Sequence, residues 1–293
     1  MSTSTSAAPA GAATTLRPVV RTVRGTATRD GAGVKLTRVI GGPELSEFDP
    51  FLLFDEFRSD VAGDYIAGFP DHPHRGFETV TYMLAGRMRH RDNQGNSGLL
   101  TPGSVQWMTA GRGIVHSEMP EQENGLMAGF QLWVNLPARD KMSAPRYQDI
   151  PPAQVPVLHP APGVTLRLLA GDLGGISGPV TGIDGTQPLY VDVQLEAGAR
   201  TALPVPATHN AFAYVYEGAA RIGGAAQATA RGELAQLGAG DRVEVGAVGG
   251  PARLVVVAGR PLGEPVARYG PFVMNTREEI MQAVSDFQAG RFR

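Results

Sequence analysis

The residues best suited to chemistry are two pairs of side chains with alternate spacing. His72 and His74 form the first pair, and His116 and Glu118 form the second. On an extended strand, residues two apart point to the same side, so each pair can present both side chains to one face. Two such pairs, separated by strand-like sequence, can meet inside one β-barrel.

Three imidazoles and one carboxylate would leave open positions on a six-coordinate metal. This donor set suits Fe(II), Mn, Co, Ni or Zn better than Mg or Ca, which prefer oxygen ligands. The chain has 6 histidines and no cysteine, so a metal site has to use His, Asp or Glu. The alternative is that these histidines only satisfy hydrogen bonds in a core.

The elements that must position these pairs are predicted to be β-strands. The chain contains 38 Gly and 23 Pro, which suits many short strands joined by turns. Runs rich in β-forming residues predict strands over 79–84, 129–134, 189–193, 211–216 and 252–257. The pattern of strand, glycine turn and strand over 82–105 returns over 214–243, which favours two barrels of one kind.

The predicted organisation has four parts. Residues 1–17 form a disordered tail, 18–143 a metal-binding barrel, 144–163 a proline-rich connector, and 164–293 a second barrel with a terminal helix. Thr276 and Glu279 form a capping box at the start of this helix. Its apolar face is expected to comprise Ile280, Val284 and Phe287, and Gly290 suits its end.

Composition excludes several classes of protein. The net charge is −2 with no basic stripe, so direct nucleic-acid binding is not expected. Hydrophobic residues make up 42% of the 293, and no apolar run is long enough to span a membrane. Residues 1–15 lack the features of a secretory signal, so we expect a cytoplasmic protein.

Several longer strings resemble the signature stretches of the pirin family, within the cupin superfamily. They cover residues 72–80, 106–116, 131–136 and 270–276, and the likeness extends over about 37–287. The resemblance implies an all-β fold of two tandem cupin-type barrels, a bicupin. It also implies that His72, His74, His116 and Glu118 bind one metal ion, usually iron. The wider cupin pattern places a glutamate ligand at Glu78, which is the reserve ligand.

The resemblance further implies a quercetin 2,3-dioxygenase-type oxidoreductase that acts on a flavonol and O2. In this hypothesis Glu118 loosens from the metal and takes the proton of the flavonol 3-hydroxyl. The family also allows an iron-binding, redox-sensitive regulatory protein that acts through protein partners. A third alternative is a barrel that keeps the metal but acts on another small phenol or enediol.

The remaining candidates have weaker patterns. His209 stands alone in the second half, so no second metal site is expected there, and His90 and His159 are interpreted as surface residues. Arg75 is expected to position partners near the metal or to form a plain salt bridge. The aromatic candidates for the mouth and walls of the site are Phe51, Phe54, Phe57, Phe69 and Trp107, each of which can equally be a core residue.

Overall fold

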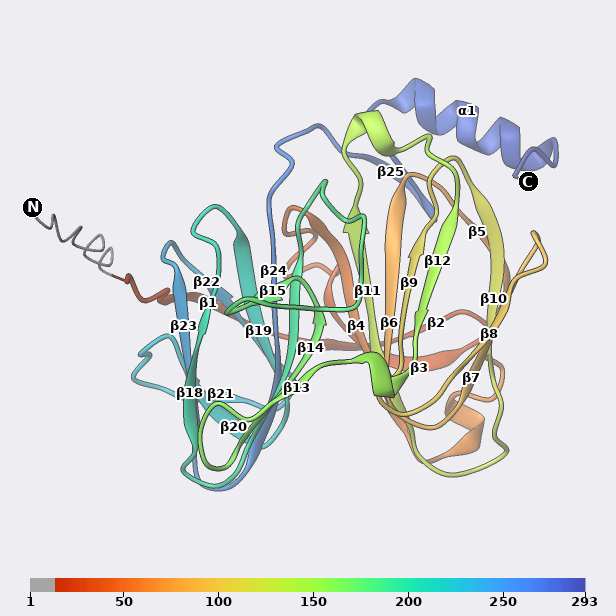
Figure 1. Ribbon diagram of the computed structural model, residues 1–293. Coiled ribbons are helices and arrows are strands. Elements are labelled where there is room, and N and C mark those ends of the chain that lie inside the picture. Colours follow the sequence, from red (N-terminus) through yellow and green to blue (C-terminus); the bar gives the residue numbers. More distant parts are fainter. Residues whose placement is uncertain (1–13, 293) are drawn as a thin grey trace, which may run out of the picture.

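The computed structural model describes residues 14–292, and it consists of two β-barrels that lie side by side (Figure 1). Each barrel is built from one seven-stranded and one four-stranded antiparallel sheet. The expected all-β fold of two barrels with one C-terminal helix is therefore confirmed.

The first barrel contains the strands that carry the candidate site. Its large sheet has the order β12 (Arg146–Ile150), β9 (Val105–Thr109), β6 (Phe77–Ala85), β11 (Met127–Asn135), β4 (Phe51–Ser59), β3 (Val34–Ile40) and β2 (Thr26–Asp30). Its small sheet has the order β5 (Phe69–His74), β10 (Ile114–Pro120), β7 (Met88–Asp92) and β8 (Ser97–Leu100).

The second barrel repeats this plan. Its large sheet has the order β1 (Val19–Arg24), β22 (Glu233–Leu237), β19 (Asn210–Glu217), β24 (Ala252–Gly259), β17 (Leu189–Leu195), β14 (Val164–Ala170) and β13 (Val157–Leu158). Its small sheet has the order β18 (Arg200–Pro204), β23 (Arg242–Ala247), β20 (Ala219–Ile222) and β21 (Thr229–Ala230).

The smaller elements are two hairpins, three 3-10 helices and one α-helix. They are β15 (Asp172–Leu173) with β16 (Ile176–Ser177), β25 (Ala267–Tyr269) with β26 (Phe272–Met274), η1 (Ala62–Asp64), η2 (Ala138–Asp140), η3 (Pro152–Gln154) and α1 (Arg277–Gln288). All five predicted strand runs fall inside observed strands, namely β6, β11, β17, β19 and β24. The repeated glycine turn is also present, because Gly86 and Gly218 follow β6 and β19 with φ of 85° and 70°.

The two large sheets pack face to face through a shared apolar cluster. Phe54, Trp107 and Phe130 of the first barrel meet Phe212 and Tyr214 of the second in this cluster. The interior of the second barrel is filled by aliphatic side chains such as Leu168, Val193 and Val245, all buried. An interior filled in this way leaves no room for a metal site like that predicted for the first barrel.

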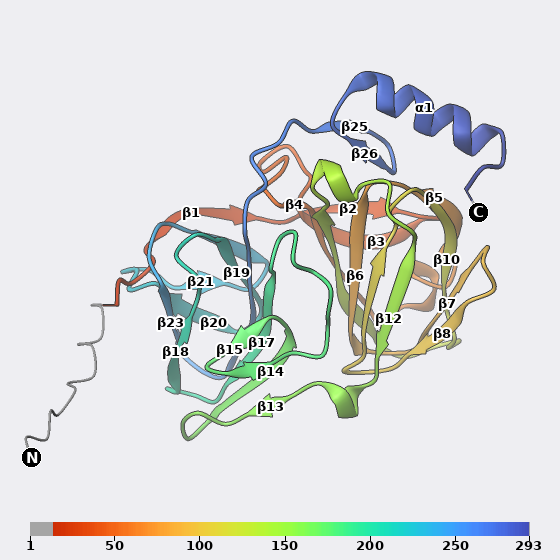
Figure 2. The same cartoon turned by 45° about the horizontal axis from the view of Figure 1, so that its top comes forward.

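Two strands belong to a different part of the fold from the one that the sequence predicts. Strand β1 pairs with β22 of the second barrel, although the sequence-based division places residues 18–143 in the first (Figure 2). Likewise β12, inside the expected connector 144–163, pairs with β9 as an edge strand of the first barrel. The four-part division by residue number stays a prediction, and strand pairing divides the chain differently at these two places.

The predicted tail, residues 1–17, extends into the described part of the chain, and its residues 1–13 lie outside that part. The Thr15 amide donates to Asp241 Oδ1 at 2.7 Å, and the buried Arg17 guanidinium donates to the carbonyls of Gly238, Pro206 and His209. These contacts attach residues 15–17 to the second barrel.

The C-terminal segment leaves the second barrel after β24 and covers one end of the first (Figures 1 and 2). Helix α1 begins with the predicted capping box, in which the Glu279 amide donates to Thr276 Oγ1 at 3.2 Å. Ile280 and Ala283 are buried against Phe272 and Phe292. Of the expected apolar face, Val284 packs against this cluster and Phe287 is 39% exposed.

A buried lysine also holds this segment in place. Lys141 Nζ donates to Gly76 O, Asn135 Oδ1 and Val273 O at 2.8, 2.7 and 3.1 Å, so its three N–H groups all have acceptors. Burial lowers the pKa of Lys141 to about 8. The contact joins β26 to the turn that follows the first two candidate histidines.

An ion pair anchors helix α1 to the barrel. The buried Arg75 donates through one N–H to Asp286 Oδ2 at 2.8 Å and through Nε to Arg112 O at 2.5 Å. Arg75 thus forms a salt bridge, which was the alternative to a positioning role near the metal, and also a hydrogen bond to the backbone. Its hydrogen bond lowers the pKa of Asp286 to about 2.

Replacing Asp286 with Ala is expected to destabilise the protein by about 3 kcal/mol, because the buried Arg75 charge loses its partner. Because the pKa of Asp286 is lower in the folded than in the unfolded chain, the pair stabilises the fold above pH ~4 and this contribution is lost toward pH 2. Urea unfolding at pH 7 measures the change. The control is Gln288→Ala on the exposed side of α1, which should cost less than ~0.5 kcal/mol; equal effects of both variants would contradict the anchoring role.

Candidate metal centre

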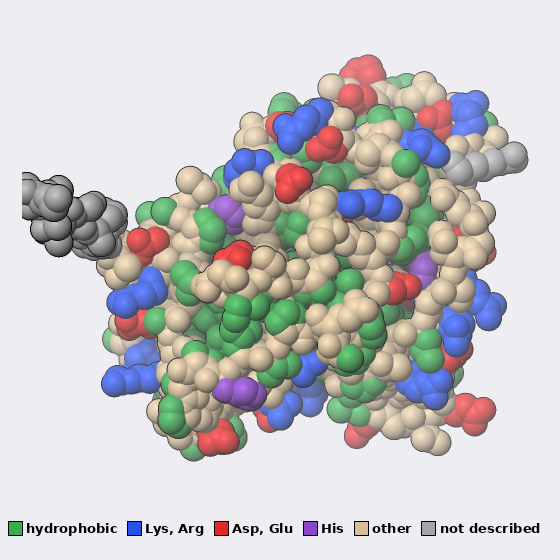
Figure 3. Space-filling model, viewed as in Figure 1, with side chains coloured by type: hydrophobic (Ala, Val, Ile, Leu, Met, Phe, Trp, Pro, Cys, Tyr) green, Lys and Arg blue, Asp and Glu red, His purple; other side chains and the backbone are tan. Residues whose placement is uncertain are grey.

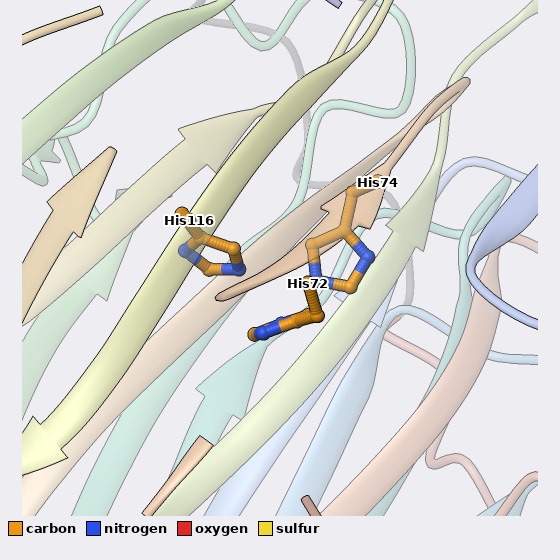
Figure 4. A group of neighbouring side chains, drawn as sticks. All are labelled: His72, His74 and His116. Atoms are coloured by element: carbon orange, nitrogen blue, oxygen red, sulfur yellow. The ribbon is translucent and has the colours of Figure 1, made fainter. Parts of the chain in front are cut away.

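Two neighbouring strands bring three histidines together. β5 and β10 are antiparallel, with His116 directly opposite His72 and Ile114 opposite His74. The alternate spacing turns all three imidazoles to the interior of the first barrel, where they point toward one another (Figure 4). The ring centroid of His72 lies 4.7 Å from that of His74 and 4.4 Å from that of His116.

The imidazole nitrogens are available for a ligand. Within residues 14–292, His74 Nδ1 and both ring nitrogens of His116 are buried without a hydrogen-bond partner. His72 Nδ1 lies 2.8 Å from Pro70 O, so it donates there and leaves the lone pair on Nε2 free. Burial lowers the pKa of His74 and His116 well below the usual value, which keeps both rings neutral near pH 7.

This arrangement fits a transition-metal ion. The candidate ligand atoms of His72, His74 and His116 all lie within 4.8 Å of one another, and no other such cluster occurs among the described residues. Three neutral imidazoles suit a first-row divalent metal. Buried nitrogens without partners are costly unless a ligand satisfies them, so their lack of partners favours an ion at this position.

Glu118, the fourth predicted ligand, is not part of the three-histidine cluster and is held by another group. It is buried on the same face of β10 and lines the same cavity as His72 and His74. Its Oε1 accepts a hydrogen bond from Thr81 Oγ1 at 2.9 Å. The Thr81 oxygen also lies 2.6 Å from Gln131 Oε1, and one hydroxyl proton cannot serve both acceptors. An amide orientation that presents the Gln131 N–H to Thr81 resolves this conflict.

The reserve ligand Glu78 points away from the histidines. It shares the outer face of β6 with Val80 and Tyr82, which pack in the cluster between the barrels. Thr109 Oγ1 donates to Glu78 Oε1 at 2.6 Å, and burial raises the pKa of this carboxyl. Glu78 is therefore held in a structural hydrogen bond.

The interpretation of His90 as a surface residue is wrong. His90 is 0% exposed and lies directly opposite Glu118 on the neighbouring strand β7. Its ring centroid is 6.1 Å from that of His116 and 4.3 Å from that of Tyr147. Both of its ring nitrogens lack hydrogen-bond partners in the described chain. His159 is exposed as expected.

His209 has an ordinary structural environment. Its Nε2 lies 2.8 Å from Gln187 O and its Nδ1 lies 3.2 Å from Thr208 Oγ1. His209 is therefore held by hydrogen bonds within the second barrel.

A cavity of about 630 Å³ opens beside the histidines. This volume is within the range of small-molecule sites. Trp133, Phe57 and Phe69 contribute aromatic walls. Three of the expected aromatic wall residues lie elsewhere, because Phe51, Phe54 and Trp107 pack in the cluster between the barrels.

The polar side of the cavity contains charged groups that the sequence analysis did not identify. Arg38 donates to both carboxylate oxygens of Asp55, at 3.0 and 2.7 Å. Burial raises the pKa of Asp55 to about 6, although Arg38 acts in the opposite direction. The Arg268 guanidinium lies 4.9 Å from the centre of the Trp133 ring and reaches the cavity from β25.

The sequence analysis also missed Thr81, the partner of Glu118, and Gln131, the partner of Thr81. Thr81 and Gln131 both lie within predicted strands and are paired with each other. Their neighbours Val80 and Leu132 face outward, so strand alternation would have placed Thr81 and Gln131 on the inner face. A polar residue on a face that points into the barrel is the sequence signal that could have identified them as site residues. The origin of Arg268, beyond the last strand of the second barrel, has no comparable signal in the sequence.

Two family models match this chain. The family model described as Pirin matches residues 33–134, and the model described as Pirin C-terminal cupin domain matches residues 190–293. A "Pirin-like protein" of Caulobacter vibrioides is 55% identical over 94% of this chain and 99% of its own length. A protein of Pseudomonas aeruginosa named "Putative quercetin 2,3-dioxygenase" is 51% identical over 94% of this chain and 98% of its own.

Solved structures show the same fold. A quercetin 2,3-dioxygenase from Acinetobacter baumannii superimposes with a TM-score of 0.87 at 32% identity, covering 95% of this chain and 99% of that one. A bacterial pirin from Escherichia coli, in complex with nickel(II), has a TM-score of 0.62 at 18% identity, covering 84% of this chain and 99% of that one. Of the helices in the described part of this chain, none is long and apolar enough to cross a membrane.

Proposed function

The chain belongs to the pirin family, and from this premise we propose that it is a metal-dependent dioxygenase that cleaves flavonols such as quercetin. The observation that carries the proposal is the cluster of three imidazoles beside an aromatic-walled cavity of about 630 Å³. In two of them, His74 and His116, buried ring nitrogens have no hydrogen-bond partner among the described residues. The relatives named for quercetin 2,3-dioxygenase activity support the same substrate class.

We assign the metal to His72, His74, His116 and Glu118. The nickel(II) complex of a protein with the same fold supports a divalent first-row ion, and we propose Fe(II), with Ni, Mn, Co or Zn as alternatives. When bound, such an ion supplies Lewis acidity toward a chelating oxygen and redox chemistry toward O2. Glu118 would supply the carboxylate ligand, and its Oε1 accepts the hydrogen bond from Thr81.

The cavity suits a flat aromatic substrate. Trp133 and Phe69 offer apolar surfaces to its rings, while Arg268 and the Arg38–Asp55 pair offer polar contacts to its hydroxyls. Glu118 lines this cavity together with His72 and His74. We therefore assign it the role of accepting the 3-hydroxyl proton, with the carboxyl held in position by the Thr81 hydroxyl.

The iron-loaded protein is expected to consume oxygen and bleach quercetin in a ratio close to one to one. An oxygen electrode and the loss of flavonol absorbance measure the two rates together. The metal-free protein and a flavone without the 3-hydroxyl serve as controls, because the proposed proton transfer requires both the metal and that hydroxyl. If the fully metallated protein turns over no flavonol, the proposed activity is wrong.

A further inference from the structure

A second cavity, of about 290 Å³, lies at the seam between the two barrels. Arg58 of β4 reaches it from the first barrel, and Arg167 of β14 and Arg253 of β24 reach it from the second. Figure 3 shows basic side chains gathered low on the face in view, between the barrels. The volume is at the lower end of the range for small-molecule sites, so it suits a compact ligand.

Arg167 is the most deeply placed of the three cations. Its Nε is buried without a hydrogen-bond partner, and the guanidinium forms no ion pair among residues 14–292. The guanidinium lies over Gly103, where an added Cβ would be 2.9 Å from an Arg167 nitrogen, so the glycine leaves room for it. A buried guanidinium nitrogen without an acceptor is costly, which favours a missing anionic partner.

The other two arginines form at most one long ion pair. The Arg58 side chain is exposed, and within the described residues it has neither a hydrogen bond nor an ion pair. Arg253 lies 3.8 Å from Glu217, and both side chains are about half exposed, at 49% and 47%. Glu217 is the one acidic residue that lines the cavity, so three cations face one carboxylate.

The buried Asp192 nearby does not complete the charge balance. Its two oxygens accept hydrogen bonds from Tyr82 at 2.9 Å and Tyr216 at 2.6 Å, and its side chain is fully buried. Burial raises the pKa of Asp192, and these hydroxyls together with the nearby Arg167 act against the rise. Arg167 therefore interacts electrostatically with this carboxyl without a hydrogen bond to it, and its side chain lines the cavity.

We propose that this cavity binds a phosphate dianion, either free or carried on a small organic molecule. The planar fork of a guanidinium matches phosphate oxygens in pairs, and two or three arginines are a common way to hold such a group. A lining of three cations and one carboxylate has the charge that a dianion would neutralise. Because the arginines come from both barrels, the ligand would join the barrels to each other.

The test is a calorimetric titration of the purified full chain in phosphate-free buffer. The probes are inorganic phosphate and glycerol 3-phosphate, with sodium chloride at equal ionic strength as the reference. Saturable binding of either phosphate probe, with a rise in unfolding temperature, is the expected result. Stronger binding of glycerol 3-phosphate would identify an ester as the ligand, and stronger binding of phosphate would identify the free ion.

Variants locate the site. The double variant Arg58→Gln/Arg253→Gln changes two exposed side chains. It should weaken phosphate binding at least ~10-fold, because each substitution removes a charge-assisted contact. The matched control is Arg200→Gln/Arg221→Gln, at a separate surface cavity of the second barrel, which should leave the affinity unchanged. No effect of phosphate beyond that of chloride, or equal weakening in both double variants, would overturn the proposal. Arg167 would then only offset the charge of Asp192.

Discussion

Replacing Glu118 with Gln is expected to lower flavonol turnover roughly 10²–10⁴-fold at full metal occupancy, which is the usual contribution of a positioned base. The amide keeps an oxygen that can coordinate a metal and can still accept the Thr81 hydrogen bond. It cannot accept the 3-hydroxyl proton. The substitution therefore separates the role of Glu118 as a base from its role as a ligand.

The measurement compares turnover per bound metal ion in the parent and the variant. Glu123→Gln is the matched control, because Glu123 is an exposed carboxylate in the loop that follows β10. Activity that falls only in proportion to metal content would show that Glu118 is a ligand and no base. Unchanged turnover at full occupancy would remove it from the mechanism altogether.

Thr81→Val offers a second test of the same site. It leaves the carboxylate intact but removes the hydroxyl that holds it at 2.9 Å. Turnover at full metal occupancy should fall, but less than in Glu118→Gln, because the base remains while the contact that fixes its position is lost. Thr81→Ser keeps the hydroxyl and should restore turnover; parent-like turnover of Thr81→Val would argue against Thr81 as a positioning residue.

Strand alternation is the part of the site that local sequence could predict. His72, His74 and His116 converge because residues two apart on β5 and β10 face the same interior. The strand texture also located β6 and β11, which form the wall opposite these histidines. The convergence of the histidines and the location of these two strands could be predicted because each depends only on the sequence within a single strand.

Features that depend on non-local pairing could not be predicted in this way. His90 was assigned to the surface because turn-like residues surround it, but pairing of β7 with β10 buries it against Glu118. The proline-rich segment was interpreted as a connector, although Arg146–Ile150 forms an edge strand between Pro145 and Pro151. Proline ends such a strand without preventing it, and nothing local specifies its partner.

The aromatic residues show the same limit. Trp107 and Phe54 have the size and type expected of cavity walls, but their places on β9 and β4 turn them outward to the second barrel. The outer face of the large sheet becomes part of a hydrophobic core only because the large sheet of the second barrel packs against it. Arg268 gives the opposite example, because it enters the cavity from a segment that crosses over from the second barrel.

The double variant His72→Ala/His116→Ala is expected to lose bound metal completely, whereas the parent should contain close to one equivalent of a first-row metal after reconstitution. These two residues are opposite each other on β5 and β10, so their removal leaves His74 as the remaining imidazole of the cluster. One imidazole and one carboxylate cannot hold a divalent transition metal against a chelator. Elemental analysis after dialysis against a chelator measures the difference.

Two controls show whether this loss is specific. His209→Ala removes a satisfied histidine of the second barrel, and His159→Ala removes an exposed one; both variants should keep their metal. Circular dichroism must show that the double variant is folded, which is expected because the substitutions remove a half-buried imidazole and an unpartnered buried one rather than apolar core residues. If His209→Ala lost the metal and the double variant kept it, the ion would bind in the second barrel, and the assignment of His72, His74, His116 and Glu118 would be wrong.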